Sequence, residues 1–195
     1  MLQVKYRKPP LTIRAVWFAE QKDKAFERNC DLVYYHHLLN KPSSPCWPVT
    51  TLWTKLDRET DDIIALIDKS VRYEIRRARK DGVETKFINS QQLLTDPGIL
   101  SAFSSAYNHF LKTKNLAGSF NSNVVKAYIK ANAFYVSLAR YQEQDYVFHG
   151  YVCDGSIGRL LYSVSLFRDE NHTGTRALIG RANRLLHMND ILSFK

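Results

Sequence analysis

The sequence has few cysteines and no long apolar run. Its three cysteines, Cys30, Cys46 and Cys153, are odd in number, widely spaced and without a nearby Cys/His pattern, so they predict neither a disulfide framework nor a zinc site. A membrane-spanning helix needs about 20 consecutive apolar residues, and stretches such as 131–139 reach roughly half of that length. The first residues lack the apolar segment of a secretory signal. These absences favour a cytoplasmic protein with no transmembrane segment.

Acidic residues are in the minority. The 195 residues include 28 Lys and Arg against 19 Asp and Glu, a formal net charge of +9. Such an excess indicates an anionic partner, which charge alone leaves open among nucleic acid, a phosphate-bearing cofactor and a membrane surface. At 45% hydrophobic and 12% aromatic residues the chain can bury a core, and its length is that of one ordinary domain.

The chain divides by pattern near residue 60. Residues 1–60 hold short β-like runs, at 11–19, 31–39 and 49–56, between polar or proline-rich segments. We therefore expect an N-terminal strand-rich arm over 1–60 and a separate core over 61–195.

From residue 61 the spacing predicts a mixture of helices and strands. Asp96 followed by Pro97 predicts an N-cap and the first position of a helix. The Asp154-Gly155 dipeptide predicts a two-residue type I′ turn, in which both residues take positive φ. The expected helices are two short ones or one bent one over 61–80, then 97–111, 122–131 and 176–194; the expected strands are 83–88, 133–140, 145–153 and 158–168. One antiparallel-biased sheet with helices around it is an α+β fold.

The strongest local charge lies in residues 69–80, which hold six basic residues and one acidic residue. On a helix, Arg72, Arg76 and Arg77 would lie outside a narrow apolar face. Arginine forks grip phosphate oxygens in bidentate geometry, so these three are candidates for binding a phosphate group or nucleic acid. A solvated basic helix without a ligand is the alternative interpretation.

A second candidate anion site is the loop of small residues at 173–175 and the helix after it. Free backbone N–H groups at a helix start attract anions, and Arg176 and Arg181 would add charge. Gly180 costs this helix about 1 kcal/mol relative to alanine, which suggests a close approach of backbone or ligand. Asn183 and Arg184 complete this candidate cofactor-binding set.

Polar side chains stand among apolar ones on the expected hairpin at 145–168. We take His149, Tyr162 and Ser165 as candidate catalytic residues, because a histidine can serve as a general base and a tyrosine as a proton donor. A histidine hydrogen-bonded in or beside the core is the alternative. The sequence has no Gly-x-Ser-x-Gly elbow and no phosphate-loop motif, which disfavours a serine hydrolase and a P-loop nucleotide-binding protein.

Two stretches carry a family resemblance. Residues 70–83, Ser-Val-Arg-Tyr-Glu-Ile-Arg-Arg-Ala-Arg-Lys-Asp-Gly-Val, resemble the segment before the first core strand of Fem-type aminoacyltransferases, which build peptidoglycan interpeptide bridges. Residues 160–168 and 177–187 look like the matching strand and helix of the same group, which belongs to the GNAT acyltransferase superfamily. The resemblance covers about residues 61–195.

This resemblance implies a GNAT-like, largely antiparallel sheet flanked by helices, and acyl transfer to an amine acceptor. The donor would be an acyl-CoA or an aminoacyl-tRNA, with no metal required. The pyrophosphate would lie at a helix N-terminus while backbone N–H groups of the preceding strand polarise the acyl carbonyl. His149 would be the general base, and Tyr162 would protonate the leaving group.

The family's fold continues beyond the last expected helix into another strand, a helix and a hairpin. The resemblance therefore implies a core truncated after the helix that follows the central hairpin, with an exposed edge on the strand of Tyr162. The N-terminal arm or a second copy in a homo-oligomer would cover that edge. The alternative hypothesis is a non-catalytic module that binds RNA or an anionic surface through the basic helix 69–80.

Overall fold

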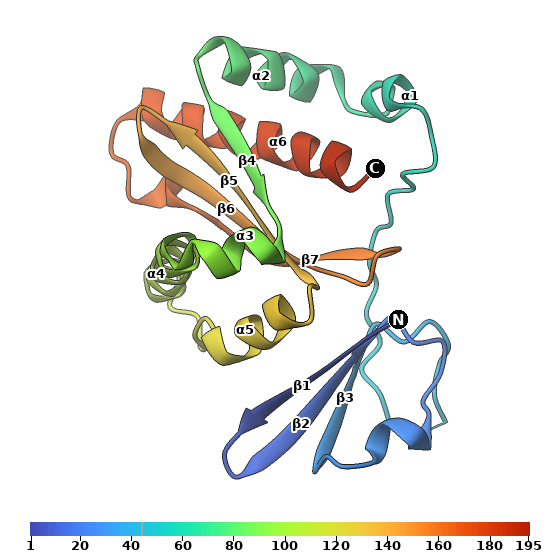
Figure 1. Cartoon of the computed structure of the whole chain (residues 1–195). Helices are drawn as coiled ribbons and strands as arrows, with labels where there is room; N and C mark the ends of the chain where they lie inside the picture. The colour runs from blue at the N-terminus through green and yellow to red at the C-terminus, as the bar shows by residue number, and fades with distance from the viewer. Residues whose placement is uncertain (44) are drawn as a thin grey trace.

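The computed structural model describes residues 1–43 and 45–195, and its strands form two sheets (Figure 1). The N-terminal sheet has the order β1-β2-β3, with β1 and β2 antiparallel and β2 and β3 parallel. Its strands are β1 (Leu2–Lys8), β2 (Leu11–Trp17) and β3 (Leu32–His36). The expected runs at 11–19 and 31–39 are confirmed. The strand expected at 49–56 was wrong, because residues 45–56 form no regular strand. The sequence pattern also missed β1.

The second sheet is the expected one. Its order is β4-β5-β6-β7, with every neighbouring pair antiparallel. Its strands are β4 (Glu84–Ile88), β5 (Phe134–Tyr141), β6 (Gln144–Cys153) and β7 (Gly158–Ser165). Antiparallel strands flanked by helices confirm the α+β fold class, and the order strand, helices, three strands, helix is the order expected from the sequence pattern.

Six α-helices and two short 3₁₀ helices accompany these strands in the described residues. They are η1 (Lys24–Glu27), α1 (Thr60–Ala65), α2 (Lys69–Lys80), α3 (Ser90–Thr95), α4 (Pro97–Thr113), α5 (Ser122–Lys130), η2 (Leu166–Arg168) and α6 (Thr173–Phe194). The Asp96 carboxylate accepts the N–H of Gly98, so the predicted cap of α4 is confirmed. None of the helices described combines the length and apolar character needed to span a bilayer.

The type I′ turn lies at another place than the sequence predicted. Gln142 and Glu143 both have positive φ, 47° and 64°, and they close the two-residue connection between β5 and β6. At the β6–β7 turn only Gly155 has positive φ. The Asp154 carboxylate there accepts the N–H groups of Ser156 and Ile157, which stabilises a longer turn in place of the expected one.

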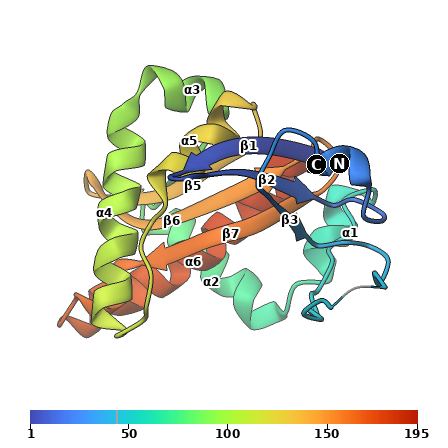
Figure 2. The same ribbon diagram turned by 90° about the horizontal axis from the view of Figure 1, so that it is seen from below.

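Helices cover both faces of the second sheet. Helix α6 lies across one face with α2 packed beside it, and α4 and α5 lie on the other (Figures 1 and 2). Alternation along β6 separates the faces: Val147 packs with the residues of α6, whereas Phe148 packs against Phe103 of α4. The sheet therefore has two apolar cores, one for each face.

The N-terminal sheet shares the α4/α5 core. Val4, Trp17 and Phe18 are buried in the same cluster as Phe103 and Phe148. The N-terminal segment also contacts the start of β7, where the Arg159 guanidinium donates to the Thr51 hydroxyl at 2.8 Å. No further strand among the described residues pairs with the outer edge of β7.

Candidate active site

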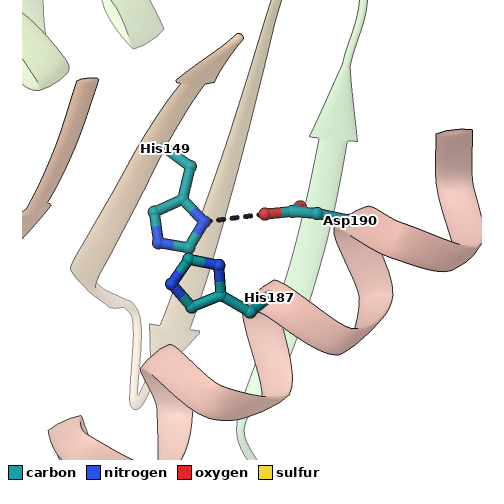
Figure 3. A group of neighbouring side chains, drawn as sticks. All are labelled: His149, His187 and Asp190. Atoms are coloured by element: carbon teal, nitrogen blue, oxygen red, sulfur yellow. Dashed lines mark hydrogen bonds and ion pairs between the residues drawn. The ribbon is translucent and has the colours of Figure 1, made fainter. Parts of the chain in front are cut away.

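The most polar part of the interior lies between β6 and α6. His149 of β6 faces α6 (Figure 3), and so does Tyr151, two residues further along the strand, which donates to Asp190. Asn183, His187 and Asp190 are four and three residues apart along α6, so they share the face that meets the strand. Ordinary strand and helix periodicity is enough to bring these five side chains together.

Asp190 is the centre of this cluster. Its Oδ2 lies 2.7 Å from His149 Nδ1 and accepts the Tyr151 hydroxyl, also at 2.7 Å. The other ring nitrogen of His149, Nε2, is 3.0 Å from Asn183 Oδ1. His149 is 0% exposed and Asp190 2%. These hydrogen bonds offset part of the cost of burying the imidazole and the carboxylate.

His187 completes the cluster without a hydrogen bond. Its ring centroid lies 4.2 Å from that of His149, and among the residues described no group bonds to its nitrogens. Burial, with His149 as a second cause, lowers the pKa of His187 to about 4, so the ring is neutral near pH 7. Burial and the Asp190 carboxylate hold the pKa of Tyr151 far above its usual value.

A buried serine lies next to this cluster. Ser137 of β5 is directly opposite His149 of β6, so the two side chains project from the same face of the sheet. Ser137 is 0% exposed, and its hydroxyl has no hydrogen-bond partner among the described residues. An unsatisfied hydroxyl of this kind costs about 1–3 kcal/mol.

A cavity of about 290 Å³ opens beside Asp190. It lies between β4 and the C-terminal half of α6, and its lining consists of Thr85, Lys86, Phe87, Leu186, Asn189, Asp190, Leu192 and Ser193. The buried cluster therefore has one side toward a space large enough for water or a small ligand.

A larger groove of about 610 Å³ runs along the outer surface of α2. Its basic lining residues are Lys69, Arg76, Arg77 and Arg181, with Tyr73 as the aromatic one. Asp68 and Glu74 also line it, so the positive charge is partly balanced.

No protein-family model and no curated protein matches this sequence. Among solved structures, the chain is similar to the C-terminal domain (DUF2156) of a protein described as a lysylphosphatidylglycerol synthetase, from Agrobacterium fabrum. The TM-score is 0.48 at 12% sequence identity, over 72% of this chain and 39% of that chain. The chain thus spans about two fifths of the length of the structure it matches, and we argue its activity from its own residues.

The expected catalytic residues do not meet at one place. His149 faces α6, whereas the Tyr162 ring packs with Phe103 and Tyr107 of α4 on the opposite face of the sheet. Ser165 ends β7 opposite Val147, and its side chain makes no cap hydrogen bond to η2. The geometry of His149 is that of the hydrogen-bonded core histidine, the alternative interpretation, and its role as general base stays a prediction.

The expected phosphate-binding residues divide among four places. Arg76 and Arg77 line the groove, and Arg72 lies one turn earlier on α2. Arg181 pairs with Asp81 at 2.8 Å and Arg184 with Glu74 at 2.7 Å, so both tie α6 to α2. Asn183 belongs to the His149 cluster.

Arg176 and Gly180 lie in the first two turns of α6. Arg176 is exposed, with its guanidinium 4.5 Å from the centre of the Phe167 ring. A Cβ added to Gly180 would meet only Arg184 Nη1, at 3.5 Å, which is ordinary contact. No described residue therefore explains the glycine by close approach.

Proposed function

We propose that the chain is an N-acyltransferase domain, which moves an acyl or aminoacyl group from a phosphate-bearing donor to an amine. The single observation that carries the proposal is a β-bulge in β7, the strand that leads into α6. Gly150 pairs with Tyr162 and Tyr151 with Leu160, which leaves Leu161 as the extra residue of a β-bulge. A bulge re-aims backbone groups, and no strand of the described residues pairs with the outer edge of β7, an edge to which an extended ligand could add.

The start of α6 supplies the site for the donor's phosphates. The N–H of Thr175 is accepted by the His172 ring, whereas those of Thr173 and Gly174 have no acceptor among the described residues. A Cβ on Gly174 would lie 2.8 Å from His172 Cε1, so the histidine cap requires glycine there. Arg176 adds positive charge beside these N–H groups, which suits a pyrophosphate or a nucleic-acid phosphate.

The proposed reaction needs little from the protein beyond positioning. The nitrogen of the acceptor amine attacks the acyl carbonyl carbon, a C–N bond forms, and the donor's C–S or C–O bond breaks. Backbone N–H groups at the β7 bulge stabilise the negative oxygen of the tetrahedral intermediate. The leaving sulfur or oxygen takes a proton from Tyr162, because burial raises the pKa of that hydroxyl to about 12 and keeps it protonated. The amine's proton passes to solvent, and Tyr162 regains a proton from solvent before the next turnover.

The donor of this proposal is either an acyl-CoA or an aminoacyl-tRNA. The second, with a peptidoglycan precursor as acceptor, follows from the Fem-type resemblance of residues 70–83. A reducing cytoplasm suits Cys30, Cys46 and Cys153, which are all free.

Donor binding and transfer test the proposal together. We expect CoA or charged tRNA to raise the melting temperature of the chain, and radiolabelled acyl groups to appear on one member of a panel of amines. Arg176→Ala should weaken donor binding about tenfold, because it removes a charge at the phosphate site. Lys126→Ala, an exposed cation on α5, is the matched control. If neither donor stabilises the wild-type chain, the proposal fails.

The groove along α2 favours a second candidate, a module that binds RNA or an anionic surface. Lys69, Arg76 and Arg77 lie on one exposed groove with Tyr73, whose ring offers a stacking surface. This function predicts that affinity for single-stranded RNA falls steeply with salt, and that Arg72, Arg76 and Arg77 changed together to alanine abolish binding. Binding that does not depend on salt would exclude it.

A further inference from the structure

The cluster at His149 has the composition of a metal site. In the described residues, His149, His187 and Asp190 each offer one ligand atom, and these three atoms all lie within 4.8 Å of one another (Figure 3). Tetrahedral Zn²⁺ bonded to nitrogen and oxygen at about 2.0–2.2 Å holds its ligand atoms roughly 3.3 Å apart. Small side-chain rotations are therefore enough to bring the three atoms into bonding distance.

The partners of His149 leave a place for a cation. Both ring nitrogens face oxygen acceptors: Nδ1 faces the Asp190 carboxylate and Nε2 the Asn183 amide oxygen. With the amide in this orientation, Nε2 is the nitrogen that donates to Asn183, and Nδ1, which faces the Asp190 carboxylate, is the nitrogen that a metal ion would share with it. The Nε2–H donated to Asn183 would then fix the tautomer that directs the Nδ1 lone pair toward Asp190, as outer partners do in metal sites.

The other two candidate ligands differ in their hydrogen bonding. Asp190 is held by the Tyr151 hydroxyl at 2.7 Å, which orients its carboxylate. His187 has no hydrogen bond in the described structure, so its ring nitrogens are available to a ligand. An unpaired imidazole next to a carboxylate and a second imidazole is a ready ligand.

The unsatisfied hydroxyl of Ser137 is the second, independent observation. It is completely buried on the face of the sheet that carries His149 and has no partner in the part of the chain that the structure describes. Three protein ligands leave a fourth position of a tetrahedral ion for water, and a metal-bound water beside Ser137 would give its hydroxyl an acceptor. The cavity that Asp190 lines lies at the edge of this cluster.

We propose that His149, His187 and Asp190 bind one divalent transition-metal ion, with Zn²⁺ as the best match, and that Ser137 hydrogen-bonds to the water in its fourth position. Two imidazoles and one carboxylate suit zinc and its neighbours in the first transition row, whereas Mg²⁺ and Ca²⁺ prefer oxygen ligands alone. The site lies on the α6 face of the sheet, away from the proposed acyl-donor path along β7.

The experiment titrates the chelator-treated full chain with Zn²⁺ and, separately, with Mg²⁺, without any acyl donor. We expect one Zn²⁺ per chain by calorimetry, a rise in melting temperature with Zn²⁺, and none with Mg²⁺. X-ray absorption should show only nitrogen and oxygen neighbours, with two imidazoles. Fewer than one Zn²⁺ per chain, or a sulfur neighbour, would overturn the proposal.

Three variants locate the ion. His187→Ala removes a half-buried ligand that makes no hydrogen bond, so the apo chain should fold, and Zn²⁺ affinity should fall at least tenfold. Ser137→Ala should keep or raise the melting temperature of the apo chain while Zn²⁺ binds about tenfold more weakly. His172→Ala, in the exposed cap of α6, is the control and should bind as the wild type does. Equal affinity in all three would overturn the proposal.

A measurement on the wild-type chain tests the proposal even if a variant fails to fold. In imidazole nitrogen NMR spectra, one equivalent of Zn²⁺ should shift the resonances of His149 and His187 and leave His109 and His172 unchanged. Shifts at the exposed histidines alone would contradict the proposal. Because no acyl donor is present, these results are independent of the acyltransferase experiments.

Discussion

The indole N–H of Trp17 donates to the hydroxyl of Tyr128 at 3.0 Å, in a buried bond that joins β2 to α5 across 111 residues of sequence. Burial raises the pKa of Tyr128 to about 12, so the hydroxyl stays protonated at every ordinary pH. Trp17 also stacks on His36 of β3, with ring centroids 4.2 Å apart. This tryptophan therefore links the N-terminal sheet to helix α5 by a hydrogen bond.

Tyr128→Phe should therefore destabilise the chain by about 1–3 kcal/mol. The substitution keeps the ring but leaves a buried indole N–H without an acceptor. Urea unfolding measures the loss. Tyr73→Phe on the exposed side of α2 is the matched control and should change the free energy of unfolding by less than about 0.5 kcal/mol. Equal stability of wild type and Tyr128→Phe would show that the bond contributes nothing.

Asp154 should make the chain sensitive to acid. Burial alone would raise the pKa of its carboxyl, but the hydrogen bonds it accepts from the terminal ammonium, the N–H groups of Ser156 and Ile157 and the Ser156 hydroxyl lower it to about 2. The folded pKa is depressed, so the stabilisation is complete above about pH 4 and is lost as pH falls toward 2. In Asp154→Asn, the urea midpoint should be lower at pH 7 and change less over that interval. If the urea midpoint of Asp154→Asn changed with pH as steeply as that of the wild type, the prediction would be contradicted.

Gly180→Ala should stabilise α6 by about 0.5–1 kcal/mol, because alanine is the better helix former and the added Cβ makes only ordinary contact with Arg184. Gly150→Ala is the opposite case. There a Cβ would lie 2.9 Å from Phe103 and 3.0 Å from Phe134, which predicts a loss of about 1–3 kcal/mol. Thermal unfolding of the two variants compares them directly. If Gly180→Ala gains stability but loses donor binding, the glycine serves a ligand.

The two ion pairs between α2 and α6 should differ in strength. The Arg181 side chain is 14% exposed and the Arg184 side chain 44%. Arg181→Ala leaves Asp81 without its closest partner in a half-buried place, and we expect a loss of about 2 kcal/mol. Arg184→Ala should cost less than about 1 kcal/mol, since exposed pairs contribute little. The free energy of unfolding of both variants, measured in low and high salt, checks these values. Equal losses of stability in the two variants would contradict the expected difference.

Local signals predicted most of the helices and strands. Asp96-Pro97 marked α4 because an aspartate cap followed by proline has one common structural meaning. Helix α3 carries a comparable signal, the capping box of Asn89 and Gln92, which was missed because the helix has only six residues. The turn at Gln142 and Glu143 has no sequence signal, since neither residue type favours positive φ; strand pairing imposes it.

The site was harder to predict because its parts are far apart in the chain. His149 was found as a lone polar residue in an apolar strand, but its partner Asp190 lies 41 residues later. The one usable signal was His187-x-x-Asp190, two potential ligands at helical spacing on α6. Tyr162 and His149 were placed together because they lie on neighbouring strands, and the register puts their side chains on opposite faces.

The shared core of the two sheets also bears on how the chain folds during synthesis. Trp17 and Phe18 leave the ribosome more than 100 residues ahead of the α5 and β6 residues that cover them. Until then, the first three strands expose an apolar face with no partner, the kind of surface that aggregates or recruits a chaperone. A nascent chain stopped after residue 120 should therefore be protease-sensitive throughout, and protection of residues 1–36 should arise only once β6 has been made.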